Sequence, residues 1–209
     1  MKKISYKLPA YKIVGVLNDG HDTHTTARSL EKRIRLRVRD VVCLPFAVEQ
    51  KYFKNLVACM KLMDVEGLVV DVTHGKRVLR ELNHVDKNAK AAGFVDTITR
   101  NGKTFTGSCS WAQALTHLAG KKHSRTIMIV GETAEARAAA RVLKPYRTKR
   151  VRTLSASGMR NLPQDSLVVD FSAQSLRTPR SVRRVTKHAL DRAHRQIMVD
   201  TLVNTLLKN

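Results

Sequence analysis

Short apolar runs alternate along the chain with segments that carry apolar residues at helical spacing. The run at 67–72 (GLVVDV) is apolar almost throughout, which is typical of a strand buried on both faces of a parallel sheet. The pattern predicts strands at 11–17, 41–48, 67–72, 95–99, 126–130, 151–154 and 166–171, and helices at 50–63, 76–92, 110–118, 134–143 and 181–207. Strands that alternate with helices in this way predict an α/β fold with mostly parallel sheets.

One segment carries two conflicting patterns. A helix is compatible with the residues from Thr26 onward, whereas 33–39 (RIRLRVR) alternates strictly between basic and apolar residues, as a strand with one basic face does. Both interpretations of 26–39 stay open. Further on, Asn101 and Gly102 form a dipeptide that favours a hairpin turn.

The chain is strongly basic. Its 39 lysines and arginines outnumber 17 aspartates and glutamates, which gives a net charge of +22. Such charge is common in proteins that bind nucleic acid, because neutralising phosphates releases counterions. The alternative is a solvated basic surface that keeps the protein soluble. The candidate nucleic-acid contacts are Arg33, Arg35, Arg37, Arg39, Lys149, Arg150, Arg177, Arg180, Arg183, Arg184, Lys187, Arg192 and Arg195.

The three cysteines, Cys43, Cys59 and Cys109, are odd in number and far apart. This spacing argues against a disulfide framework and against a metal site, so we expect no metal and buried free thiols. No apolar run approaches the ~18 residues of a membrane span, and none near the N-terminus resembles a signal peptide. We therefore expect no membrane association and a cytoplasmic or other reducing intracellular location, while the oligomeric state stays open.

Several stretches together resemble one known family. Residues 11–19 (YKIVGVLND) match its opening strand and turn, and 67–75 (GLVVDVTHG) stand where the family has G-x-N-V-T-x-P-H-K. Residues 89–98 (AKAAGFVDTI) match A-x-x-x-G-A-V-N-T-I, and 127–143 match a strand, glycine loop and cofactor-domain helix. Over roughly residues 11–145 the chain resembles the shikimate dehydrogenase family. The resemblance implies a shikimate-dehydrogenase-like α/β domain at 1–108, and a reduced Rossmann-like domain at 109–209 with a basic C-terminal helix.

The family interconverts a ketone and a hydroxyl with NADP, and a Lys–Asp pair handles the proton. The resemblance places that lysine at Gly75 and that aspartate at Trp111, so neither group is retained. If the chain is active, the resemblance and its neighbouring residues leave Lys76, Asp71 and Asp96 as the candidates. Trp111 is expected to fill the old cleft, with base stacking as the alternative.

The glycine-rich cofactor loop is also altered. The family has G-x-G-G-x-(A/S), whose glycines let backbone N–H groups approach a pyrophosphate. Here the loop begins Gly131, Glu132, Thr133, so one glycine remains and a carboxylate is added. The resemblance therefore implies no intact cofactor site and no bound cofactor.

Three functions follow as hypotheses. The first is a non-catalytic relative whose basic surface binds RNA, as a component of a ribosome or another ribonucleoprotein. The second is an NADP-dependent oxidoreductase acting on shikimate, 3-dehydroshikimate or a related acid, with Lys76 taking the place of the lost lysine. The third is a protein-interaction or ligand-sensing module, in which the basic surface is incidental.

Overall fold

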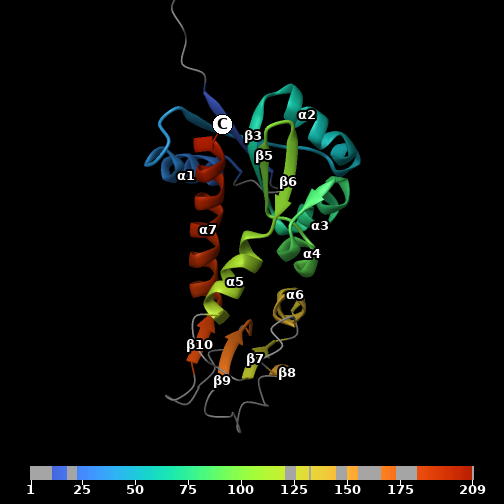
Figure 1. The fold of residues 1–209 in the computed structure, drawn as a ribbon, viewed down its shortest axis with the longest axis vertical. Coiled ribbons are helices and arrows are strands. Elements are labelled where there is room, and N and C mark those ends of the chain that lie inside the picture. The colour runs from blue at the N-terminus through green and yellow to red at the C-terminus, as the bar shows by residue number, and fades with distance from the viewer. Residues whose placement is uncertain are drawn as a thin grey trace, which may run out of the picture.

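The two β-sheets of the protein lie at opposite ends of its long axis, and one long helix starts at the second sheet and runs along the side of the first (Figure 1). The structure is a computed structural model. It describes residues 11–17, 23–120, 126–131, 133–144, 150–154, 166–172 and 183–208. The α/β class expected from the sequence is confirmed.

The first sheet has six strands in the order β2-β1-β3-β5-β6-β4. Strands β1, β2 and β3 are parallel, with Val14 opposite Cys43 and Gly67, whereas β5 pairs antiparallel with β3 and β6. The β5–β6 hairpin turns at Asn101 and Gly102, where the dipeptide predicts it. The strands are β1 (Lys12–Leu17), β2 (Val41–Phe46), β3 (Val65–Val70), β4 (His84–Val85), β5 (Thr97–Asn101) and β6 (Thr104–Ser108).

The second sheet is fully parallel, in the order β10-β9-β7-β8. Its central strands β7 and β9 are buried, as the apolar sequences TIMIV and SLVVD predict. Helix α6 follows β7 directly, as in a Rossmann-like unit. The elements are β7 (Thr126–Val130), α6 (Ala134–Leu143), β8 (Arg150–Leu154), β9 (Ser166–Asp170), β10 (Arg183–Thr186) and α7 (Lys187–Lys208).

Helix α7 belongs to both halves of the molecule. It starts at the second sheet, pairs with α5 and ends against the first sheet and α1 (Figure 1). Its last turns bury Val199, Leu202, Val203 and Leu206 in a core shared with strand β1 and helix α1. The last strand of the first sheet, β6, ends at Ser108 and the first strand of the second sheet, β7, begins at Thr126, while α7 packs back against the first sheet. The other helices are α1 (Thr23–Arg35), η1 (Gln50–Asn55), α2 (Leu56–Leu62), α3 (Val72–Glu81), α4 (Lys87–Ala92) and α5 (Ser110–Gly120).

The ambiguous segment 26–39 is helical up to Arg35 and then turns toward β2. Leu30 and Ile34 face the core from α1, whereas Leu36 is 82% exposed. A strand at 33–39 would place Leu36 on the same face as Ile34 and Val38, so the strand interpretation is wrong.

Two predicted helices are interrupted. The segment 76–92 contains strand β4, because His84 and Val85 pair with β6, and Asp86 then begins a new helix by accepting the Ala89 N–H at 2.6 Å. Residues 183–186 form edge strand β10 rather than the first turn of the C-terminal helix. In addition, the predicted helix at 50–63 starts as a 3-10 segment. At 84–85 and at 183–186, pairing with the edge of a sheet overrides the helical pattern.

All three cysteines are free thiols, but only two are buried. Burial, with Glu31 close by, raises the pKa of Cys43 to about 12. Burial also raises the pKa of Cys109. Cys59 is exposed, which corrects the expectation that every thiol is buried. Among the described helices, none is long and apolar enough to cross a membrane.

Candidate active site

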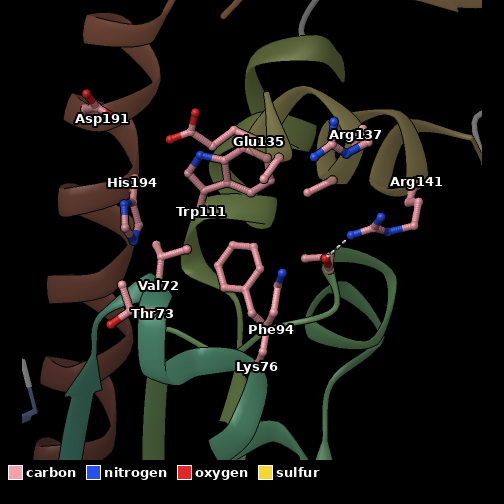
Figure 2. Close-up of a pocket in the computed structure, with 13 residues that line it drawn as sticks. Val72, Thr73, Lys76, Phe94, Trp111, Glu135, Arg137, Arg141, Asp191 and His194 are labelled. Carbon is pink, nitrogen blue, oxygen red and sulfur yellow. Dashed lines mark hydrogen bonds between the residues drawn. The ribbon is translucent and has the colours of Figure 1, made fainter. Parts of the chain in front are cut away.

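A cleft of about 430 Å³ lies where the two halves of the molecule meet. Helices α3 and α4 contribute to it from the first half, α6 from the second, and α5 and α7 also line it. In Figure 2, His194 and Asp191 project from α7 on one side and Arg137 and Arg141 from α6 on the other, with Trp111 between them. The lining residues are Val72, Thr73, Lys76, Ala92, Phe94, Trp111, Ala134, Glu135, Arg137, Ala138, Arg141, Asp191 and His194.

Trp111 forms the apolar floor of this cleft. Its ring centroid lies 5.8 Å from that of Phe94 and 6.1 Å from that of Phe171, both tilted. Such arrangements are typical of packed aromatic groups. Only 7% of Trp111 is exposed, so it fills space as expected and does not offer an open face for stacking on a base.

Lys76 lines the cleft, but the position before it is closed to any side chain. A Cβ at Gly75 would lie 2.3 Å from the backbone oxygen of Val95. The lysine of the family pattern therefore has no room at position 75. Lys76 is exposed on α3, one residue further on, and brings a cation to the cleft.

Asp71 has a structural task at the start of α3. Its Oδ1 accepts the backbone N–H of His74 at 3.0 Å and the hydroxyl of Thr73 at 2.7 Å. The same oxygen lies 2.7 Å from Nδ1 of His74, whose ring is buried against Phe53. Asp71 is not among the residues that line the cleft, so it stays a helix cap rather than a cleft carboxylate.

Asp96 is buried behind the cleft wall and caps α5. Its two oxygens accept the backbone N–H groups of Ser110 and Trp111, each at 2.8 Å, and Oδ1 also accepts the hydroxyl of Thr97 at 2.8 Å. Oδ2 lies 3.1 Å from Nε2 of His194. Burial by itself raises the pKa of Asp96, but His194 and the two backbone N–H groups outweigh it, and the pKa lies below its usual range.

The loop that begins at Gly131 has kept one feature of a phosphate-binding turn. Gly131 has φ +117°, a backbone conformation that favours glycine, and it packs against the backbone of Phe171. Thr133 caps α6, because its hydroxyl accepts the N–H of Ala136 at 3.1 Å. Glu132 lies outside the described residues.

These residues fit an anionic group at the start of α6. Glu135 would repel a phosphate, but its carboxylate lies 3.5 Å from Nζ of Lys187. Arg137 and Arg141 add two cations to the cleft face of the same helix. The Thr133 cap removes one backbone donor, while the local charge and the dipole of α6 favour a phosphate. For a phosphate at this position, the positive charge of Arg137 and Arg141 would stand in for some of the backbone N–H donors of a glycine-rich loop.

The predicted nucleic-acid residues have several different surroundings. Arg35 and Arg37 form ion pairs with Glu31 and Asp200, and Arg39 is exposed. Arg184 is paired with buried Asp170, so this member of the set is structural. Lys187 is paired with Glu135, and Arg192 lies 3.2 Å from the ring of His188. Lys149, Arg177 and Arg180 lie outside the described residues, and only the backbone of Arg150 and Arg183 is described.

Arg33 and Arg195 do come together. They line one groove between α1 and α7, and an adjoining groove adds Lys32 and Arg37. Among the described residues, no group of three or more histidines, cysteines, aspartates or glutamates is placed to hold a metal ion.

Sequence reasoning missed four residues of the cleft: Phe94, Arg137, Arg141 and His194. Arg137 and Arg141 stand on the helix that follows the glycine loop, so the helical period of 134–143 could have found them. His194 has no local signal, because only the return of α7 brings it to Asp96, nearly one hundred residues earlier in the chain.

Comparisons with known proteins identify the class. No family model matches the chain. Among solved structures, a 5-ketofructose reductase of a Gluconobacter species superposes with a TM-score of 0.70 at 12% identity, covering 93% of this chain and 99% of that one. A shikimate dehydrogenase from Listeria monocytogenes, solved with shikimate and NAD, gives 0.63 at 13% identity, covering 98% and 99%. The fold is therefore the two-domain, shikimate-dehydrogenase-like fold with a Rossmann-like domain.

Sequence comparison finds similarity to shikimate dehydrogenases over part of the chain. The NADP⁺ shikimate dehydrogenase of Methanococcus maripaludis is 31% identical over 101 residues, which cover 46% of this chain and 36% of the relative. That of Alkaliphilus oremlandii is 30% identical over 103 residues, covering 47% and 36%. The match thus spans about a third of these relatives. The protein is a relative of the shikimate dehydrogenases, as the sequence motifs predict.

Proposed function

We propose that the protein is an NADP-linked oxidoreductase that acts on a small anionic hydroxy acid or keto acid in the cleft between its two halves. The observation that carries this proposal is the cleft itself, which is lined by Lys76 from one half and by Arg137 and Arg141 from the other. The curated relatives with this fold are NADP⁺ shikimate dehydrogenases, and this favours an oxidoreductase over RNA binding as the main function.

The second half would hold the nucleotide. The start of α6, with Gly131 before it and Arg137 on its cleft face, is suited to the phosphates. When bound, the nicotinamide supplies or accepts the hydride. The residues of the chain bind and orient the substrate and exclude water from it.

The first half would hold the substrate. Lys76 offers an ammonium group to a carboxylate, and the edges of Phe94 and Trp111 make part of the cleft wall apolar. Arg141 donates to the backbone oxygen of Ala92 at 2.8 Å (Figure 2) and so connects α6 to α4 across one end of the cleft. This contact restrains the two halves around a ligand.

Nucleotide binding can be followed through Trp111, the single tryptophan of the chain. Because Trp111 lies in the cleft, we expect bound NADPH to quench its emission and to emit in turn by energy transfer. Arg137→Glu should weaken this binding at least tenfold, whereas Lys90→Glu, the same charge change on an exposed residue of α4, should leave it unchanged. Equal binding by both variants would remove α6 from the proposed site.

RNA binding is a second candidate function, favoured by the groove between α1 and α7. Arg33 and Arg195 line this groove, and Lys32 and Arg37 line the groove that adjoins it. Its position away from the cleft allows both functions in one molecule.

The groove is tested by titrating RNA at several salt concentrations. We expect Arg33→Glu to weaken binding and to lower the slope of log K against log salt by about one. Arg80→Glu, an exposed residue of α3, serves as the control. Binding with the same slope in both variants would exclude the groove as the RNA site.

A further inference from the structure

One histidine of the cleft stands beside a buried carboxylate. His194 borders the cleft from α7, with 22% of its side chain exposed, and Nε2 lies 3.1 Å from Oδ2 of Asp96. Nε2 itself is buried and forms no hydrogen bond with the described residues. The packing of α7 against α5 therefore holds the ring near the carboxylate.

Asp96 cannot move away from this histidine. Two backbone N–H groups at the start of α5 and the hydroxyl of Thr97 hold its oxygens, as described above. A carboxylate fixed in this way favours the tautomer of His194 that carries a proton on Nε2. The other ring nitrogen, Nδ1, then remains to accept or donate a proton.

We propose that His194, positioned by Asp96, is the proton-transfer residue of the cleft. This inference rests on the oxidoreductase function proposed above and names the group that handles the substrate proton. The cleft has a tryptophan at position 111 and no side chain at position 75. In place of the Lys–Asp pair of the family pattern, His194 on α7 is the proton carrier and Asp96, beside it, is the carboxylate.

The step balances in both directions. In reduction, an N–H bond of the His194 imidazolium breaks and an O–H bond forms on the carbonyl oxygen of the substrate, while its carbonyl carbon receives a hydride from reduced nicotinamide, which is oxidised. In oxidation, neutral His194 accepts the hydroxyl proton. Asp96 keeps its charge throughout and acts as a positioning residue.

Other charged groups also border His194. Asp191 lies one turn earlier on α7, Glu135 lies on α6 and Lys76 lies on α3. Val72 and Trp111 supply the apolar part of the surroundings (Figure 2).

His194→Gln is the first test, with His188→Gln as the matched control on an exposed position of the same helix. We expect His194→Gln to lower turnover of shikimate with NADP⁺ by at least ~100-fold, which is typical of the loss of an acid–base group. NADPH binding should stay as in the wild type. The acid limb of the pH–rate profile should also disappear in this variant. Turnover and a pH profile equal to those of His188→Gln would overturn the assignment.

Nitrogen NMR of the His194 ring gives a readout that does not depend on turnover. We expect the Nε2-protonated tautomer in the free protein, and a shift of the Nδ1 resonance when shikimate is added together with NADPH. If the neutral ring carries its proton on Nδ1, or if its resonances do not shift when both compounds are added, the role of His194 would be overturned. If the wild type binds neither compound, the oxidoreductase proposal itself fails. Binding of both compounds with an unresponsive ring refutes the histidine alone.

Discussion

Gly75→Ala is expected to destabilise the protein by about 3 kcal/mol. In an ordinary helix, alanine is more stable than glycine by ~1 kcal/mol, so the expected sign is the opposite of the helical preference. The reason is steric, because the added Cβ would lie 2.3 Å from the Val95 backbone oxygen and 3.3 Å from Cβ of Phe94. The backbone there cannot give way easily, since Gly75 also accepts the Val95 N–H at 3.2 Å.

Urea unfolding measures this effect. Lys76→Ala, at the exposed neighbouring position, should change the free energy of unfolding by no more than about 0.5 kcal/mol. Gly75→Lys should be at least as destabilising as Gly75→Ala, and it should not create the lysine of the family pattern. A Gly75→Ala protein more stable than the wild type would show that position 75 has room for a side chain.

Asp96→Ala is expected to lower stability by a similar amount, about 3 kcal/mol. The substitution leaves the buried N–H groups of Ser110 and Trp111 without their acceptor and removes the charge beside His194. Asp86→Ala is the control, because Asp86 caps α4 from a less buried position. A cap of that kind contributes ~1 kcal/mol. Equal losses in the two variants would mean that burial of Asp96 adds nothing.

The same carboxylate makes stability depend on pH. Its pKa is lowered in the folded state, so the unfolded chain binds the proton more readily. The stabilisation is therefore complete above the unfolded pKa of roughly 4 and is lost as the pH falls through the lower folded value. Asp96→Asn should lose stability at neutral pH and flatten this acid dependence. Parallel wild-type and Asp96→Asn curves of stability against pH would contradict the assignment.

The fold could be predicted from sequence where one local pattern dominates. Strands such as 126–130 and 166–171 are apolar throughout, so they indicate buried parallel strands without further information. The prediction is incomplete where tertiary pairing decides, as at His84 and Val85, which join the edge of the first sheet. The alternation at 33–39 does not form a strand, because α1 continues to Arg35 with Leu30 and Ile34 on its buried face.

The candidate site was predictable only in part, for a similar reason. Lys76 lines the cleft as its place after Gly75 suggests. Asp71 and Asp96 lie in motifs that resemble those of the family, but both cap helices. Sequence alone does not show that their oxygens accept backbone N–H groups. His194 enters the cleft because α7 packs back onto the first domain, which no local pattern indicates. Sequence alone also does not show that Arg184 forms an ion pair with buried Asp170.

The most direct test of the oxidoreductase function is the formation of NADPH when the wild-type protein is mixed with NADP⁺ and shikimate or a panel of small hydroxy acids. We expect NADPH to accumulate beyond one equivalent of protein with at least one of these acids. Lys76→Ala should slow its formation, whereas Lys90→Ala should not. Binding of NADPH in the cleft without any turnover across the panel would contradict an oxidoreductase and leave the cleft as a ligand-binding site.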